Sequence, residues 1–213
     1  MKKGVVLIIS LFFITAISLL VVKNLDDTDK FLQKQNYIQD NTQVIISIED
    51  FQKEVGKLLK QNSKDIDEVL ENDIFEDSFM KLKLKELDLS FKLKKYDRVD
   101  INDIAVKDSN ILREYFSNNN VFNYDYLVDI YKEKFQNSDT KVENSKQLDD
   151  IINTFILRSY SKDILKIKDN LGFFKPDNLY ELDIKVKYNS ATASAYYILK
   201  KEGEVQYFDV SFK

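Results

Sequence analysis

The chain contains no cysteine and no histidine, and it has only one proline and four glycines among 213 residues. Without cysteine there are no disulfides, no lipid-modified cysteine anchor and no thiolate nucleophile. Without histidine or cysteine, the usual ligands of zinc and haem and the commonest general base are also missing. The glycines, at positions 4, 56, 172 and 203, are too scattered to form a phosphate-binding loop. No cofactor is therefore assigned, and binding or assembly becomes a better expectation than catalysis.

The rest of the composition is that of a folded protein. Hydrophobic residues make up 44% of the chain, which includes 12 tyrosines and 15 phenylalanines. After an N-terminal segment, about 150 residues remain, enough for one compact core or two small units. The net charge of −4 makes the body as a whole a poor candidate for sequence-independent DNA binding, which depends on many cations.

A nearly unbroken apolar run extends from Val5 to Val22, directly after Lys2 and Lys3. Eighteen helical residues rise about 27 Å, close to the roughly 30 Å of a bilayer core. Lysines are retained on the cytoplasmic side, so the rest of the chain is expected outside. Residues 21–25 offer no small-x-small cleavage site of a secretory signal peptide. The sequence therefore predicts a single membrane pass.

Nothing in the sequence interrupts a helix after this run. There is no glycine between Val5 and Gly56, and no proline before Pro176. Apolar residues continue at helical spacing, at Leu25, Leu32, Ile38, Ile45, Ile48, Val55 and Leu59, and Phe31, Val44, Phe51 and Leu58 widen the stripe. We therefore expect one helix over residues 5–62, whose first third lies in lipid and whose remainder is amphipathic and packs against protein.

The first part of the body changes from helical to strand spacing. Residues 64–75 are expected to form a short second helix. From Phe79 to Leu93 apolar residues alternate with charged ones, which predicts strand. The alternation slips by one residue at Lys85–Glu86, which predicts either a bulge or a turn between two strands.

Helical spacing returns between about Asp100 and Leu171. Four helices are expected, around Ile111–Phe116, Leu127–Phe135, Leu148–Tyr160 and Ile164–Leu171. Asn123 or Asp125 can cap the second helix, the third begins after Ser145, and Gly172 with Pro176 forms a stop signal.

The C-terminal residues alternate again and predict three strands, Leu182–Tyr188, Ala193–Lys200 and Val205–Phe212, with a tight turn at Glu202–Gly203. A small antiparallel meander needs a cover for its apolar face, and the C-terminal half of the long helix can supply it. The predicted fold is α+β: a long N-terminal transmembrane and amphipathic helix packed on an antiparallel sheet. An all-α subdomain is expected as an insertion over about residues 98–176 of a body that spans 63–213.

The N-terminus resembles a known leader. A short basic segment, residues 1–4, ends in Gly4 and is followed by an apolar start at Val5 and an uninterrupted amphipathic helix. This arrangement is similar to the class III leader of type IV pilins and pseudopilins. In that family a prepilin peptidase cleaves after the glycine and methylates the new amino terminus, which implies processing between Gly4 and Val5. Most members carry a glutamate at the fifth mature position, where this chain has Ile9. The missing glutamate and the helical insertion both resemble the K-type minor pseudopilin of type II secretion systems.

The resemblance implies a minor pseudopilin-like subunit in the bacterial inner membrane, with its C-terminal body in the periplasm. Its expected partners are other minor pseudopilins, the prepilin peptidase, the inner-membrane assembly platform and membrane lipid. Such a subunit helps to initiate or cap a filament that exports protein or, in some bacteria, takes up DNA during competence. Two alternatives stay open. One is an unprocessed bitopic scaffold of an envelope assembly, held by an ordinary signal anchor, and the other is an anchored periplasmic enzyme.

The apolar run carries a candidate helix-packing face. Ser10, Thr15 and Ser18 are its only polar residues, and small side chains allow neighbouring membrane helices to approach closely. Ile9 occupies the position where the family's glutamate is tied to registration with a neighbour, so its presence would suit a tip subunit. The alternative is that this face contacts only lipid.

Charged residues give two further candidate sites. Lys81, Lys83 and Lys85, continued by Lys92, Lys94, Lys95 and Arg98, either guard an exposed strand edge or face the phosphates of DNA. Tyr196, Tyr197 and Tyr207 would stack on bases if exposed, or else serve as half-buried cross-strand partners.

Carboxylates crowd two stretches of the body. These are Asp65, Asp67, Glu68, Glu71, Asp73, Glu76 and Asp77, and then Asp97, Asp100 and Asp103 with Asn102. They form either a solvated surface or a set of oxygen ligands for calcium. Because neither stretch has a loop motif with a glycine at the turn, no calcium ligand is assigned.

Overall fold

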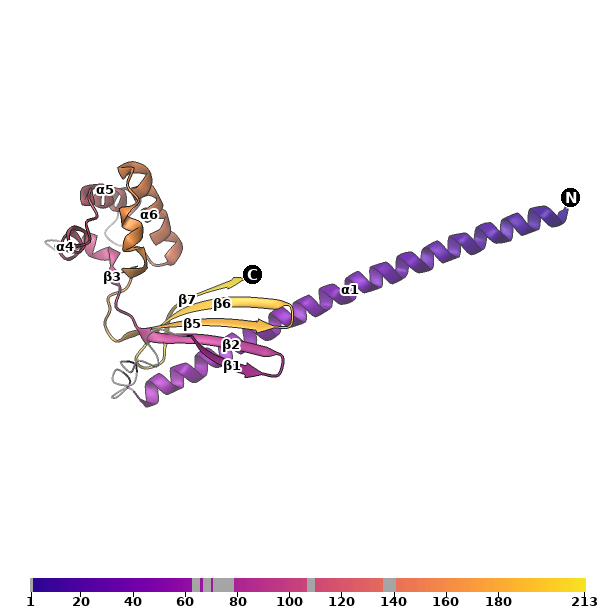
Figure 1. Ribbon diagram of the computed structural model, residues 1–213, viewed down its shortest axis with the longest axis horizontal. Coiled ribbons are helices and arrows are strands. Elements are labelled where there is room, and N and C mark those ends of the chain that lie inside the picture. The colour runs from indigo at the N-terminus through magenta and orange to yellow at the C-terminus, as the bar shows by residue number, and fades with distance from the viewer. Residues whose placement is uncertain (1, 63–65, 67–69, 71–78, 107–109, 136–140) are drawn as a thin grey trace.

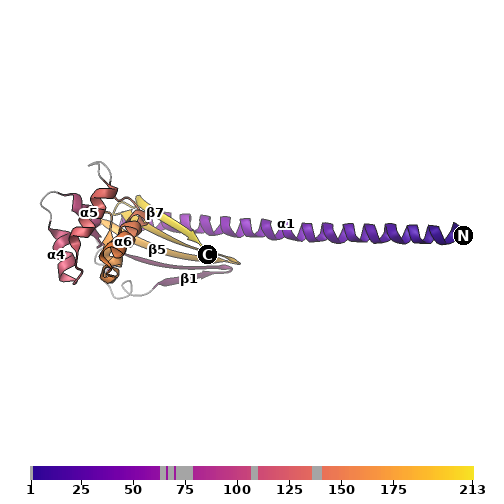
Figure 2. The ribbon, with the colours of Figure 1, turned by 90° about the horizontal axis from the view of Figure 1, so that it is seen from above.

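A computed structural model describes residues 2–62, 66, 70, 79–106, 110–135 and 141–213, with residues 2–17 and 19 described by their backbone only. One very long helix, α1, runs beside a sheet and projects far beyond it (Figure 1). A group of short helices lies at the end of the sheet opposite the N-terminus (Figure 2).

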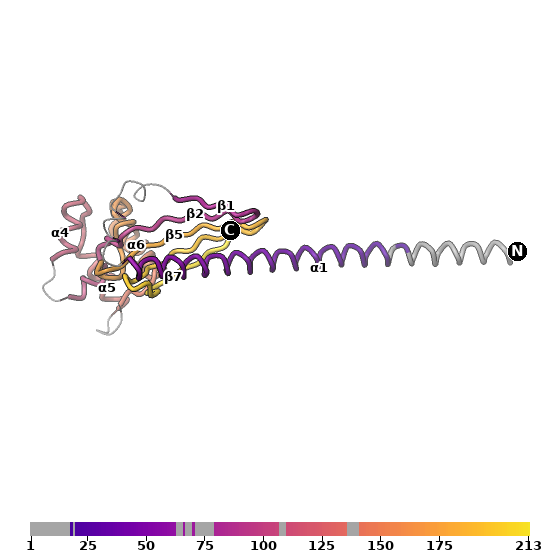
Figure 3. Tube along the Cα trace, turned by 90° about the horizontal axis from the view of Figure 1, so that it is seen from below, coloured from indigo at the N-terminus to yellow at the C-terminus, as the bar shows by residue number. Residues whose placement is uncertain are grey.

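Helix α1 spans Lys2–Gln61 without a break. Its 60 residues correspond to about 90 Å of helix. The residues from 20 to 39 are all exposed, and Asp40 is the first buried one. Beyond it, Val44, Ile48, Val55 and Leu59 are buried against the body. The helix therefore has a free N-terminal part and a packed C-terminal part, as Figure 3 shows.

The sheet has five antiparallel strands in the order β1-β2-β5-β6-β7. They are β1 Met80–Leu84, β2 Leu87–Lys95, β5 Leu179–Tyr188, β6 Ala191–Lys200 and β7 Val205–Phe212. The slip in alternation is a turn at Lys85–Glu86, where Lys85 has a φ of 51°. Strands β1 and β7 are the two edges, so the lysines of β1 do lie on an edge strand.

One face of the sheet is covered by the C-terminal part of α1. The shared core joins Val44, Ile48 and Leu59 of the helix to Leu182 and Ala193 of the sheet. Alternate residues of each strand point to the same face, and on this face those residues are mainly apolar. The expected cover of the sheet by the long helix is therefore confirmed.

Two glycines let α1 approach the sheet closely. A Cβ on Gly56 would lie 2.8 Å from the carbonyl oxygen of Gly203, in the turn between β6 and β7. Gly203 also has a φ of +83°, which side chains rarely adopt. Nearer the N-terminus, Asn189 and Ser190 of the β5–β6 turn donate hydrogen bonds of 3.0 and 3.1 Å to the Asp40 carboxylate. These contacts fix both ends of the packed segment.

The stretch between β2 and β5 is mainly helical. It contains η1 Ile101–Ala105, α4 Ile111–Asn118, α5 Tyr124–Lys134, α6 Ser145–Ser159, η2 Asp163–Lys166 and η3 Lys168–Asn170. Its ends meet in a short parallel pair, β3 Val99–Asp100 with β4 Leu171–Gly172. Its buried residues form one cluster that also includes Leu179 and Ile198 of the sheet. The helices thus share a core with one end of the sheet.

Three of the four helices expected in this stretch are present, and the fourth is not. Residues 164–171 form two 3₁₀ turns and β4. The prediction was wrong because Ile164, Ile167 and Leu171, which are all buried, have a spacing that suits 3₁₀ turns as well as an α-helix. Helix α6 is capped by Asn144, whose side chain accepts a hydrogen bond from the amide of Gln147. The helix was expected to begin after Ser145, and it begins one residue earlier, at Ser145.

The coarse prediction of an α+β fold with a long N-terminal helix and an antiparallel sheet is confirmed. In the part of the chain that the structure describes, no helix has an apolar stretch that meets the requirement for crossing a membrane. Of the expected second helix, Ile66 and Leu70 are helical and buried, and the rest lies outside the described residues.

Candidate functional site

The predicted processing and packing residues all lie on the free part of α1. Gly4, Val5, Ile9, Ser10 and Thr15 occupy successive turns of a helix described there by its backbone only. Ser18 is exposed. These positions therefore all lie on one helix, and their roles in processing and packing stay predictions.

Beyond them, α1 exposes large apolar side chains. Phe31, Ile38 and Ile45 recur every seven residues and have exposed fractions of 64%, 54% and 41%. A spacing of seven keeps them near one face of the helix. Apolar side chains in such a row mark a contact surface more often than isolated ones do. This stripe was recognised in the sequence as part of the amphipathic pattern, but it is not covered by the described body.

A basic array lies on the sheet face opposite α1. Lys81 is paired through Ser90 with Lys185, and Lys83 is paired through Asp88 with Lys187, across strands β1, β2 and β5. Directly paired residues share a face, so all four ammonium groups project from the same side. Two lysines of one strand are about 7 Å apart along it, and β1 and β5 are about 10 Å apart. We call these four residues the lysine array.

The lysine array surrounds a shallow hollow of about 430 Å³, whose lining also includes Asp88, Ser90 and Thr192. Lys83 and Asp88 form an exposed ion pair of 3.6 Å. Lys185 lies with its ammonium nitrogen 4.1 Å from the centre of the Phe79 ring. Three cations are thus left beside the single ion pair in the hollow, which gives it a net positive charge.

The structure brings together only part of the predicted basic stripe. Lys81 and Lys83 join the array, but Lys85 lies in the β1–β2 turn. Lys94 and Arg98 form ion pairs with Glu181 instead. Lys185 and Lys187 were missed as site residues, although their alternation in the predicted strand 182–188 already placed them on one face.

The three tyrosines considered for base stacking are used within the protein. Tyr197 is 6% exposed and stacks on Phe208 with ring centres 6.0 Å apart. Tyr207 packs edge-on against Phe173 at 5.0 Å. The Arg98 guanidinium lies over Tyr196, 5.4 Å from the centre of the tyrosine ring. The alternative, that these tyrosines are packed cross-strand partners, is the one that the structure supports.

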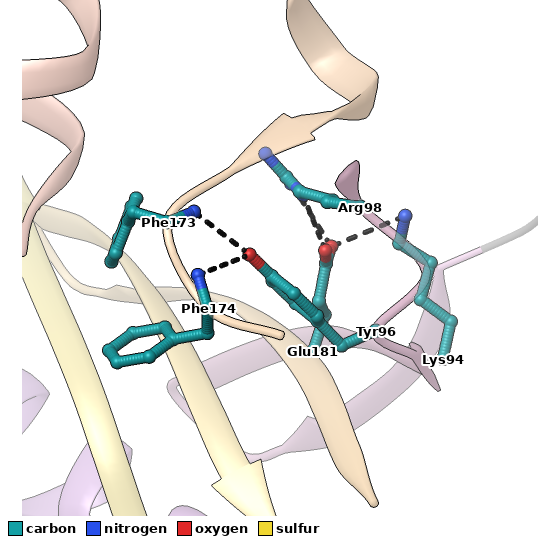
Figure 4. A network of polar contacts seen from close by, with 6 residues as sticks. All are labelled: Lys94, Tyr96, Arg98, Phe173, Phe174 and Glu181. Carbon is teal, nitrogen blue, oxygen red and sulfur yellow. Dashed lines mark hydrogen bonds and ion pairs between the residues drawn. The ribbon is translucent and has the colours of Figure 1, made fainter. Parts of the chain in front are cut away.

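A polar joint connects the sheet to the helical stretch (Figure 4). Arg98 donates to both carboxylate oxygens of Glu181, at 2.5 and 3.1 Å, and Lys94 approaches the same group at 3.2 Å. The Tyr96 hydroxyl accepts hydrogen bonds from the amides of Phe173 and Phe174, at 3.2 and 3.3 Å. The two chain segments that enter and leave the helical stretch are therefore tied together at one point.

Burial governs the electrostatics of this joint. Glu181 is 1% exposed, and its charge is balanced by two cations. Burial lowers the pKa of Arg98, but the hydrogen bond and the charge of Glu181 outweigh burial and raise it. Burial also raises the pKa of Tyr96. Arg98 therefore stays charged and Tyr96 stays neutral at neutral pH, as suits a structural joint.

The second predicted acidic stretch has a structural role. Asp100 is 7% exposed and caps the N-terminus of η1, where it accepts a hydrogen bond of 2.9 Å from the amide of Asn102. The Asn102 amide group donates to the carbonyl oxygens of Val142 and Phe173, both at 3.1 Å. No group of three or more potential metal ligands is found among the residues that the structure describes. The acidic residues of the first stretch, at positions 65, 67, 68, 71, 73, 76 and 77, lie outside them, and calcium stays unassigned.

Comparison of the chain with protein-family models, with curated proteins and with solved structures finds no match.

Proposed function

We propose that this chain is a minor pseudopilin-like subunit, anchored in the bacterial inner membrane by the N-terminal part of α1 and carrying its body in the periplasm. The observation that carries the proposal is the single helix of 60 residues, which is free over its N-terminal part and packed on an antiparallel sheet over its C-terminal part. The leader ending at Gly4 and the apolar residues 5–22 supply the processing site and the membrane anchor.

The subunit would act by assembly. The exposed stripe of Phe31, Ile38 and Ile45 offers a surface to helices of other minor pseudopilins. Ile9 in place of the usual glutamate suits a subunit that initiates or caps a filament, and the mainly helical stretch between β2 and β5 resembles the insertion of the K type. The prepilin peptidase, the assembly platform and membrane lipid complete the proposed set of partners.

The test is processing. The full chain is coexpressed with a prepilin peptidase, and the mass of the product is measured. The proposal expects an amino terminus at Val5 carrying a methyl group, and expects Gly4→Ala to retain Met1 or Lys2. Lys57→Ala, which changes an exposed residue outside the leader, is the control and should be cleaved normally.

An intact leader in the presence of active peptidase would overturn the pseudopilin reading. It would favour the second candidate, a bitopic inner-membrane scaffold that never enters a filament. The observation behind that candidate is the same free helix, because an unprocessed anchor and a processed one leave the same body outside the membrane.

A further inference from the structure

We infer that the lysine array is a docking surface for the phosphate backbone of double-stranded nucleic acid. Lys81, Lys83, Lys185 and Lys187 project from one face of three adjacent strands and flank a hollow with the hydroxyls of Ser90 and Thr192. Lysine ammonium groups and hydroxyls are among the protein groups that contact phosphate oxygens. The array would bind without reading base sequence.

The composition of this face argues against a protein partner. The two cross-strand rows that hold the array consist of Lys81, Ser90, Lys185, Ser194 and Ser211, and of Lys83, Asp88, Lys187 and Thr192. The next row of the same face, toward the helical stretch, consists of Lys92, Asp183, Tyr196 and Asp209. No apolar side chain stands in the two rows that hold the array. A protein interface normally has a desolvated core depleted of charge, whereas nucleic-acid interfaces are polar and positively charged. The helical stretch covers only the other end of this face, at Tyr196 and Ile198.

The packing of the aromatic residues argues for a duplex over a single strand. Binding of single strands relies on exposed rings on which bases stack. Tyr196, Tyr197 and Tyr207 are engaged within the fold, and Phe79 lies under the Lys185 ammonium group. The array thus offers charge without a stacking platform, which matches the outside of a duplex.

A lipid surface fits the array poorly, and this step rests on the proposed function. The strands run roughly along α1, so the array faces sideways from the helix axis (Figure 3). A bilayer crossed by α1 would lie across that axis and would not meet the array. A protein anchored in this way keeps the array open to the surrounding solution.

The test uses the full chain in detergent micelles and a fluorescent duplex of mixed sequence, with binding followed by anisotropy. The three lysines that are not paired with Asp88 predict a slope of about −2.7 in log K against log salt, so that affinity falls by about 40-fold between about 50 and about 200 mM salt. The double variant Lys185→Glu with Lys187→Glu should weaken binding at least tenfold. The control pair Lys146→Glu with Lys162→Glu makes the same charge change at exposed positions of the helical stretch and should change affinity less than threefold.

A gain of binding gives a second readout that does not depend on a weakened variant. Asp88→Asn removes the only carboxylate that lines the hollow and should tighten duplex binding several-fold. Equal losses in the two lysine pairs, or no gain from Asp88→Asn, would overturn the inference. Tighter binding to a single strand, to polyglutamate, or to vesicles of equal parts phosphatidylglycerol and phosphatidylcholine would also overturn it. Cleavage at Gly4 is scored separately, so the array can fail while the proposed processing stands.

Discussion

Among the described residues, Glu181 is the most deeply buried charged side chain, and it joins the sheet to the segment that enters the helical stretch. Its neutral replacement, Glu181→Gln, leaves the Arg98 guanidinium without a charged partner. Breaking a buried ion pair from one side costs about 3–5 kcal/mol, but Arg98 and Lys94 are 25% and 39% exposed. We therefore expect a loss of about 2 kcal/mol in the free energy of unfolding, measured with urea.

The control for this prediction is Asp209→Asn on exposed β7, where a change under about 0.5 kcal/mol is expected. The combination of Glu181→Leu with Arg98→Leu should recover part of the loss, because apolar pairs often replace buried ion pairs without cost. If the single Gln variant were as stable as the parent chain, the joint would contribute nothing to stability.

Asp100 gives a prediction about pH. Burial raises the pKa of its carboxyl group above the usual value, opposed by the hydrogen bond from Asn102. The folded state therefore binds this proton more tightly than the unfolded state does. The resulting contribution to stability is present below the unfolded pKa and is lost as pH rises through the folded one. Asp100→Asn removes this dependence and keeps an oxygen for the Asn102 amide.

We expect the stability of Asp100→Asn relative to the parent chain to rise between about pH 3 and pH 7. Urea unfolding at a series of pH values measures this difference. A relative stability that fell over this range would mean that the native carboxylate is favoured by its surroundings, contrary to the direction given by burial.

At the scale of elements, the closest contact of α1 with the sheet is at Gly56. Glycine is about 1 kcal/mol worse than alanine within a helix, so Gly56→Ala would stabilise an isolated helix. In the folded chain the new Cβ would lie 2.8 Å from the Gly203 carbonyl oxygen, and a backbone atom cannot easily move away. We expect a net loss of about 1–2 kcal/mol in urea unfolding. Lys57→Ala, one residue away and exposed, should stay within about 0.5 kcal/mol of the parent.

The elements that were predictable from the sequence are those with long, regular patterns. The continuous helix follows from the lack of glycine and proline, and β7 follows from its alternation, with the bounds Val205–Phe212 as expected. The turn at Lys85–Glu86 was one of two readings of the slipped alternation. The 3₁₀ helices η2 and η3 were not predictable, because the spacing of three residues between Ile164 and Ile167 fits both kinds of helix.

The candidate site was less predictable because it depends on contacts between distant strands. Lys81 and Lys83 are about one hundred residues from Lys185 and Lys187 in the sequence, and only the pairing of β2 with β5 brings them together. The joint at Glu181 has the same cause. Gly172 suggested a helix stop, but it also leaves room for the Tyr96 hydroxyl, which would be 1.9 Å from a Cβ there. No local pattern reports such a contact.

At the scale of the whole molecule, α1 divides the chain into a body and a free rod. Residues 20–39 are exposed throughout, whereas Asp40, Val44 and Ile48 are buried against the sheet. The apolar side chains on the rod therefore contribute nothing to the described core. This division is what a tethered assembly subunit requires, because the rod can contact lipid or neighbours without disturbing the body.

The division can be tested by shortening the chain from its N-terminus. A chain that begins at Gln39 keeps every buried residue of α1, and its free energy of unfolding should match that of the full chain within about 0.5 kcal/mol. A chain that begins at Glu54 lacks Val44 and Ile48, whose burial is worth about 1.5–3 kcal/mol each, and it also lacks the hydrogen bonds to Asp40. It should lose at least about 4 kcal/mol or fail to fold, as followed by circular dichroism in urea. Equal stability of the two shortened chains would show that the sheet does not need α1 as its cover, and loss of folding in the longer one would show that the rod is part of the body.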